Sequence, residues 1–111
     1  MMKRLTARLA GIAVLATSAP AIAYDNSAEV KVTVIEVTYM PTNLIFQVNQ
    51  TIGTCAAGTM LTWTPQGSTQ DLKDKNAAAV LAGLMTAKAT GSSVRLYVAN
   101  SGCKVEFIHL L

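Results

Sequence analysis

Polar and apolar residues alternate along Glu29-Val30-Lys31-Val32-Thr33-Val34, and the alternation changes phase in Ile35-Glu36-Val37-Thr38-Tyr39. A period of two residues is typical of a β-strand with one buried face. Because the apolar residues Val34 and Ile35 adjoin, the pattern slips by one residue, as it does where a β-bulge bends and twists a strand. This segment therefore predicts a long and strongly curved first strand.

Four more runs with strand patterns follow, and one run between them has a helical pattern. The strand runs are residues 44–49, 60–63, 93–99 and 103–110, with residues 100–102 as a hairpin turn before the last one. In the last run Cys103, Val105 and Phe107 are in phase, so we expect them on one face.

The helical run lies between the third and fourth strand runs. Its apolar stripe ends in a lysine and consists of Ala77, Val80, Leu81, Leu84, Met85 and Lys88. We expect Asp71 or Ser68 to cap the start of the helix, and Gly91 to end it in a left-handed conformation. A second stripe of small residues lies opposite: Ala79, Ala82, Gly83, Thr86 and Thr90. Such a stripe allows close approach of another element, or it is a plain solvent face of an alanine-rich helix.

The order strand, strand, strand, helix, strand, strand predicts a mainly β chain with one helix, arranged as an OB-fold-like five-stranded barrel. A curved first strand fits this barrel because that strand takes part in both halves. In such a barrel the third and fifth strands lie side by side and parallel, so Cys55 before the third and Cys103 at the start of the fifth would be close enough to bond. Other α+β sheets share the same element order.

Residues 1–23 have the pattern of a cleavable secretory signal peptide. Three positive charges lie in the first eight residues, and an uncharged apolar run then ends in Ala21-Ile22-Ala23, with small residues at the −3 and −1 positions. The run is interrupted by polar residues and a proline, and it is shorter than the roughly 18 residues of a membrane-spanning helix. A buried N-terminal helix or an uncleaved anchor is the alternative. We therefore expect a secreted or periplasmic protein whose mature part, residues 24–111, is a single OB-like domain without a membrane span.

Loss of this segment also removes the net charge. The whole chain carries nine Lys and Arg against six Asp and Glu, for a net charge of +3. Three of the nine basic residues lie in residues 1–8, so six remain to balance the six acidic ones. No basic patch is left that would indicate nucleic acid or an anionic membrane surface as a partner.

The two cysteines are most simply explained as one disulfide. An even number of cysteines in an exported chain favours pairing, and a Cys55–Cys103 bridge would close a loop of about 49 residues, worth roughly 4 kcal/mol. Two free thiols or an intermolecular bridge are the alternatives. Neither cysteine has a partner at zinc-ligand spacing, and His109 is the single histidine, so we expect no metal site.

The sequence contains no catalytic motif, and we expect no enzyme and no cofactor. A catalytic histidine needs a nucleophile and an orienting carboxylate beside it, and the sequence pattern places neither near His109. Glu36 and Glu106 would face each other as a carboxylate pair only if the first and last strands were neighbours. A small hydrolase that uses His109 is the remaining enzymatic alternative.

Aromatic residues offer better candidates for contact with a ligand. Tyr97 is out of phase with the apolar residues of its strand, so it is expected to point outward beside Arg95, and we take these two as candidate surface-contact residues. Tyr39 is a further aromatic of interest, whereas Trp63 is expected to fill the core.

The C-terminal half carries a resemblance. The segments Leu84-Met85-Thr86-Ala87-Lys88-Ala89-Thr90-Gly91-Ser92-Ser93-Val94-Arg95-Leu96-Tyr97-Val98 and Gly102-Cys103-Lys104-Val105 resemble small exported proteobacterial proteins of uncharacterised function. In the order of its elements the mature chain is similar to the receptor-binding B subunits of A–B toxins, particularly the subtilase-cytotoxin and pertussis-like groups. That similarity implies a disulfide-bonded OB-fold that forms a homo-oligomeric ring, with helices lining a pore, and that binds glycans. No glycan-contact motif is recognised, so no binding residue is carried over.

These observations favour an exported, non-enzymatic binding module for a glycan or protein partner, in the manner of a toxin B subunit. The alternative is a periplasmic accessory or structural protein that binds another exported protein.

Overall fold

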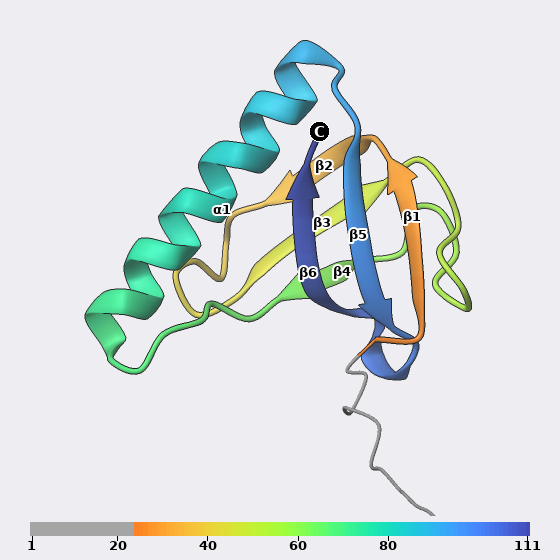
Figure 1. Cartoon of the computed structure of the whole chain (residues 1–111). Helices are drawn as coiled ribbons and strands as arrows, with labels where there is room; N and C mark the ends of the chain where they lie inside the picture. Colours follow the sequence, from red (N-terminus) through yellow and green to blue (C-terminus); the bar gives the residue numbers. More distant parts are fainter. Residues whose placement is uncertain (1–23) are drawn as a thin grey trace, which may run out of the picture.

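The computed structural model (Figure 1) describes residues 24–111, and the predicted signal peptide lies outside the described residues. The described residues form six strands, one long helix and one short 3₁₀ turn. In chain order these are β1 (Asn26–Val30), β2 (Val32–Glu36), β3 (Leu44–Val48), β4 (Leu61–Trp63), α1 (Gln70–Thr90), β5 (Val94–Ala99), η1 (Ser101–Cys103) and β6 (Lys104–Leu110).

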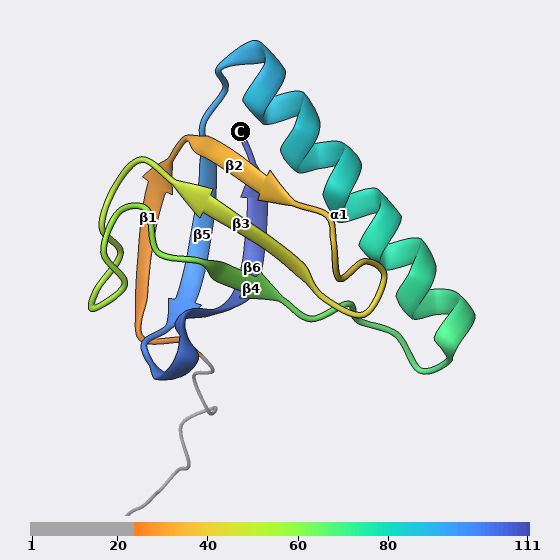
Figure 2. The same ribbon diagram turned by 180° about the vertical axis from the view of Figure 1, so that it is seen from behind.

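The six strands form one curled sheet in the order β1-β5-β6-β4-β3-β2. Neighbouring strands are antiparallel except β4 and β6, which run parallel with Thr62 opposite Lys104. Figure 1 shows β1, β5 and β6 as one wall with β2, β3 and β4 crossing behind it, and Figure 2 shows the same strands from the other side, with β2, β3 and β4 in front. The sheet is thus a half-barrel, and α1 lies along its open side in contact with β2.

The strand count is six and not the predicted five, because the long first strand is divided at Lys31. β1 pairs with β5, whereas β2 pairs with β3, so the chain changes partners at this residue. The backbone N–H of Lys31 donates to Oδ1 of Asn49 (2.9 Å), and its Nζ donates to the carbonyl oxygen of Gly91 (2.5 Å). Lys31 is a polar residue at a position where the alternation already requires an outward side chain. The sequence pattern alone therefore does not reveal that the strand is divided there.

The predicted bulge is present close to its expected place. The register shifts between Val32 and Val34, which makes Thr33 the extra residue of β2. Val34 is consequently turned outward, with 44% of its surface exposed, and Ile35 takes the inward position as half-buried. The bulge and the break at Lys31 together let one continuous segment serve both edges of the sheet.

The core fills the space between the two walls. Its centre is formed by the residues that the alternation of β3 and β5 predicts: Leu44, Phe46, Val48, Val94, Leu96 and Val98 are all nearly or completely buried. Trp63 of β4 is buried as expected. Full burial of one such aliphatic or aromatic side chain is worth roughly 1.5–3 kcal/mol, so these alternating strands supply a large part of the stability.

Helix α1 differs from the prediction at its start and on one side. Thr69, and not Asp71 or Ser68, is the N-cap, and its hydroxyl accepts from the backbone N–H of Leu72 (3.2 Å). Gly91 ends the helix at φ 73°, as predicted. The buried residues are Ala77, Leu84 and Ala87, with Val80 and Leu81 half-buried. Met85, at 54% exposure, and Lys88 lie on the exposed flank because the contact strip passes through Ala87.

The disulfide between Cys55 and Cys103 is present, with 5.8 Å between the Cα atoms. It joins the loop before β4 to η1, just before β6, and the parallel pairing of these two strands brings their starts together as predicted. Cys103 itself belongs to the turn rather than to the strand. Its φ of 49° is incompatible with extended backbone, so β6 begins at Lys104.

Candidate binding face

The outer surface of the wall formed by β1, β5 and β6 carries two rows of side chains. Glu29, Arg95 and His109 are direct neighbours across the three strands and form a polar row. Ser27, Tyr97 and Phe107 form the next row in the same way. Directly paired residues project to the same side of a sheet, and neighbouring strands lie about 4.8 Å apart. A charged row and an aromatic row therefore adjoin on one surface, which we call the outer face.

Phe107 reaches this face through a bulge that the sequence does not predict. Tyr97 pairs with Phe107 but Val98 pairs with Val105, so Glu106 is an extra residue in β6. Val105 is 2% exposed and Phe107 is 48% exposed. The expectation that both lie on one face is wrong, because the bulge reverses the phase of the strand between them.

Four rings gather on the outer face. The ring of Tyr97 is the centre of the group, in edge-to-face contact with Tyr24 and His109 (both 4.9 Å between centroids) and with Phe107 (5.9 Å). Tyr24 also contacts Phe107 at 6.1 Å. Such edge-to-face pairs contribute roughly 0.5–1.5 kcal/mol beyond the area they bury. Tyr97 is half-buried by its neighbours, whereas Phe107 and His109 keep exposed surface for another molecule.

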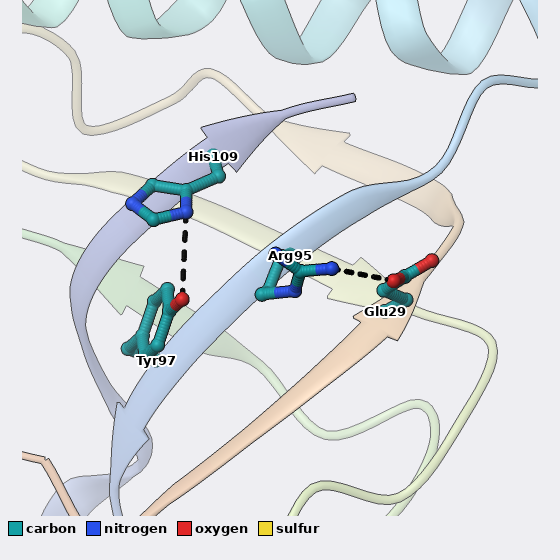
Figure 3. Close-up of polar contacts among 4 residues, drawn as sticks. All are labelled: Glu29, Arg95, Tyr97 and His109. Carbon is teal, nitrogen blue, oxygen red and sulfur yellow. Dashed lines mark hydrogen bonds and ion pairs between the residues drawn. The ribbon is translucent and has the colours of Figure 1, made fainter.

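The polar row is linked to the rings (Figure 3). Nη2 of Arg95 is 2.6 Å from Oε1 of Glu29, and the hydroxyl of Tyr97 is 3.4 Å from Nδ1 of His109. The hydrogen bond to Glu29 is the chief cause that raises the pKa of the Arg95 guanidinium above its ordinary value, with the neighbouring Tyr97 second. Ion pairs at this level of exposure add little stability. The pair therefore fixes the direction of the Arg95 side chain more than it holds the fold together.

This arrangement suits an amphipathic ligand. Phe107 offers an apolar ring surface, while the polar row offers hydrogen-bonding groups that begin at His109, two residues away on the same strand. Sites for small polar molecules commonly combine aromatic surface with a few placed polar groups. The structure places both predicted contact residues, Tyr97 and Arg95, on this face. It adds Tyr24, Phe107, Glu29 and His109, of which Tyr24 directly follows the predicted cleavage site and Glu29 occupies the outward phase of the first strand.

The other predicted groupings do not form. Glu36 and Glu106 belong to β2 and β6, which are separated by β4 and β3 in the sheet. The carboxylate of Glu36 instead accepts hydrogen bonds from the backbone N–H (2.8 Å) and the hydroxyl of Thr38, and these bonds lower its pKa. Tyr39 lies in the turn after β2, 59% exposed and away from the outer face.

The small-residue stripe of α1 lines an apolar groove. A hollow of about 360 Å³ lies between the C-terminal half of α1 and the ends of β5 and β6, with Leu110 and Leu111 on its far side. The helix comes close to β6 at Gly83, where an added Cβ would be 2.8 Å from the side chain of Leu110. The stripe is thus one wall of an open groove, and all its residues except the half-buried Gly83 remain exposed to solvent.

Within residues 24–111 no three His, Cys, Asp or Glu side chains are grouped so that they could hold a metal ion. The same part of the chain has no helix that is both long and apolar enough to cross a membrane. No protein-family model, curated protein or solved structure matches this chain.

Proposed function

We propose that this chain is an exported, non-enzymatic binding module that recognises a carbohydrate through its outer face. The observation that carries this proposal is the ring group of Tyr24, Tyr97 and Phe107 beside the Arg95–Glu29 pair, with half of Phe107 exposed. Sugars present C–H-rich faces together with hydroxyls, so they match an aromatic surface that adjoins a row of hydrogen-bonding groups.

We further propose that the half-barrel is a variant of the OB-fold. The parallel β4–β6 pair supports this assignment, as does the position of α1 between the third and fourth predicted strands. The change of partner at Lys31 is also in agreement, since the first strand of an OB barrel contributes to both halves. In this view β1 and β2 correspond to the single first strand of the barrel.

Export is part of the proposal. The predicted cleavage after Ala23 would make Tyr24 the first residue of the secreted or periplasmic protein, and the Cys55–Cys103 bridge fits an oxidising compartment. The intact mass of the protein recovered from periplasm or medium tests this directly. A mass that includes any part of residues 1–23 would contradict processing at this position.

A glycan array with the purified mature protein tests the binding function. We expect a defined set of glycans to bind, and we expect Phe107→Ala and Tyr97→Ala to lose most of that signal. Tyr39→Ala is the matched control, because it removes an exposed aromatic ring away from the outer face and should leave the signal unchanged. Absence of glycan signal from a correctly folded wild-type protein would overturn the proposal.

A homo-oligomer is a further part of the toxin-like version. The groove between α1 and Leu110–Leu111 offers a surface where a second copy could pack against small side chains. Sizing by light scattering tests it. A strict monomer without glycan binding would exclude the toxin-like version altogether.

The same groove favours the second candidate function, an accessory protein that binds another exported protein. Leu110 and Leu111 line it and are each more than half exposed, and exposed apolar side chains of this kind mark protein-binding surfaces when they are grouped. Co-purification from periplasm separates the two functions. This alternative predicts a stoichiometric protein partner whose binding is lost in Leu110→Asp and retained in Phe107→Ala.

A further inference from the structure

Four side chains on the outer face form two neighbouring polar pairs across three strands. Glu29 on β1 accepts from Arg95 on β5 (2.6 Å), and the hydroxyl of Tyr97, two residues further along β5, is 3.4 Å from Nδ1 of His109 on β6. Figure 3 shows the second ring nitrogen of His109 turned away from Tyr97. His109 is exposed, so this Nε2 atom is available to another molecule.

The chemistry of these groups sets the direction of the bond between Tyr97 and His109. A tyrosine hydroxyl has one proton to donate, and the unprotonated nitrogen of a neutral imidazole can only accept. Because the oxygen lone pairs of a phenol are delocalised into its ring, the hydroxyl is a stronger donor than acceptor. The hydroxyl proton of Tyr97 is therefore directed to Nδ1 of His109, 3.4 Å away. A neutral imidazole that accepts at Nδ1 carries its proton on Nε2.

We propose that Tyr97 is a positioning residue for His109: its hydroxyl donates to Nδ1, which fixes the ring with its proton on Nε2 and makes Nε2–H the donor of the outer face to a ligand oxygen. Tyr97 thereby has two roles, one through its ring in the aromatic group and one through its hydroxyl. The identity of the ligand, a carbohydrate, rests on the proposed function. The position of the proton on the His109 ring does not depend on it.

This assignment narrows what the outer face recognises. The half-exposed ring of Phe107 lies on the same strand as His109, two residues away, so both project to the same side. A bound sugar would place a C–H-rich face on Phe107 and present a hydroxyl or ring oxygen to Nε2–H of His109. The selected class is therefore a saccharide with an acceptor oxygen at the edge of its apolar face.

The first experiment measures the ring itself and requires no ligand. Long-range ¹⁵N–¹H NMR spectra of the mature protein, recorded above the titration range of histidine, distinguish a protonated ring nitrogen from an acceptor nitrogen. We expect Nε2 of His109 to be protonated and Nδ1 to have the resonance of a hydrogen-bonded acceptor. In Tyr97→Phe the ring is retained but the hydroxyl is lost, so the Nδ1 resonance should move to that of a free acceptor. A proton on Nδ1 in the wild type, or no change in Tyr97→Phe, would overturn the assignment.

The second experiment measures binding to the glycan with the strongest wild-type array signal. Loss of one neutral hydrogen bond weakens binding by about fivefold, and we expect this loss in His109→Ala. His109→Gln should restore binding, because its amide N–H lies near the position of Nε2, whereas His109→Asn should not. Equal binding by His109→Ala and the wild type would contradict the role of Nε2–H. If no glycan binds the wild type, the proposed function fails, and the NMR measurement still decides the assignment of the ring.

Discussion

The indole Nε1 of Trp63 donates a hydrogen bond to Oδ1 of Asn76 across 2.9 Å, and the same oxygen accepts from the backbone N–H of Gln66, also at 2.9 Å. These two bonds tie the end of β4 and the following connection to α1. Trp63 is 7% exposed, so its N–H has little access to water if the partner is removed.

Asn76→Ala should therefore lower the free energy of unfolding by about 1–3 kcal/mol, the cost of leaving a buried donor unpaired. Urea unfolding followed by the fluorescence of Trp63 measures this change. Asn76→Asp is the control, since it keeps an acceptor oxygen in place and should retain most of the stability. An Asn76→Ala protein as stable as the wild type would show that the bond carries no net energy.

The disulfide gives a second prediction. Cys55 and Cys103 are 48 residues apart in sequence, and a closed loop of that length stabilises the folded state by roughly 4 kcal/mol in the chain-entropy account. The double variant Cys55→Ala/Cys103→Ala should lose stability of this order in urea. Alanine is preferred to serine because Cys55 is completely buried and a hydroxyl there would lack a partner.

Reduction of the wild-type protein is the matched measurement, because it removes the bond without changing the sequence. We expect the reduced protein and the double variant to unfold at similar urea concentrations. A double variant with unchanged stability would indicate that η1 and the loop before β4 are held by other contacts, such as the bond from Thr54 N–H to Oδ1 of Asn100.

The alternation of polar and apolar residues correctly predicted the buried residues of strands that keep one face toward the core along their whole length. Leu44, Phe46 and Val48 follow this rule, and so do the residues of β5. It failed at Lys31 and Glu106, for one physical reason. Both are polar residues at points where the strand changes its pairing, and a polar residue fits an outward position on either side of the change. By contrast, the adjoining apolar pair Val34 and Ile35 signalled the bulge in β2.

The outer face was predictable only in part, because one of its strands also changes its pairing at a polar residue, Glu106. The outward phase of β5 identified Arg95 and Tyr97 without knowledge of their neighbours. Phe107 was assigned to the wrong face because the bulge at Glu106 leaves no mark in the pattern, and the contact of Tyr24 with Tyr97 joins residues at opposite ends of the mature chain. Long-range pairing of this kind is set by the sheet order, which no local pattern contains.

Two glycines, one inside α1 and one at its C-terminal end, should respond in opposite directions to replacement by alanine. Gly83 is inside the helix, where alanine is favoured over glycine by about 1 kcal/mol. An added Cβ would come within 2.8 Å of the Leu110 side chain, but that side chain is 60% exposed and its end can turn away. Gly83→Ala should therefore stabilise the protein by up to about 1 kcal/mol.

Gly91 has φ 73° at the end of the helix, a conformation that costs a residue with a Cβ atom roughly 1–2 kcal/mol. Gly91→Ala should be destabilising by about that amount even though its Cβ would meet nothing within 4 Å. Thermal unfolding of both variants tests the pair. If Gly83→Ala proved the less stable of the two, Leu110 would have to be fixed against α1 more firmly than its exposure indicates.

The carboxylate of Glu36 supplies the prediction that depends on pH. Its pKa is lowered chiefly by the hydroxyl of Thr38 and secondly by the backbone N–H of the same residue. Thr38→Val keeps the shape of the side chain and removes the hydroxyl, so the pKa of Glu36 should rise toward its ordinary value. It should stop short of that value because the backbone N–H still donates. A ¹³C NMR titration of the Glu36 carboxyl group measures this change, and Thr42→Val, in the following turn, should leave it unaffected.

The sign of the accompanying change in stability follows from linkage. A carboxyl group whose pKa is lower in the folded state stabilises that state above its unfolded pKa, and the stabilisation is lost as the pH falls through the folded value. Thr38→Val should therefore reduce the stability near neutral pH and have a smaller effect in acid below both values. Because Glu36 is solvent-exposed in this contact, the difference should be small and should decrease with added salt. A Glu36 titration that is identical in the wild type and Thr38→Val would show that the hydroxyl does not hold the carboxylate in solution.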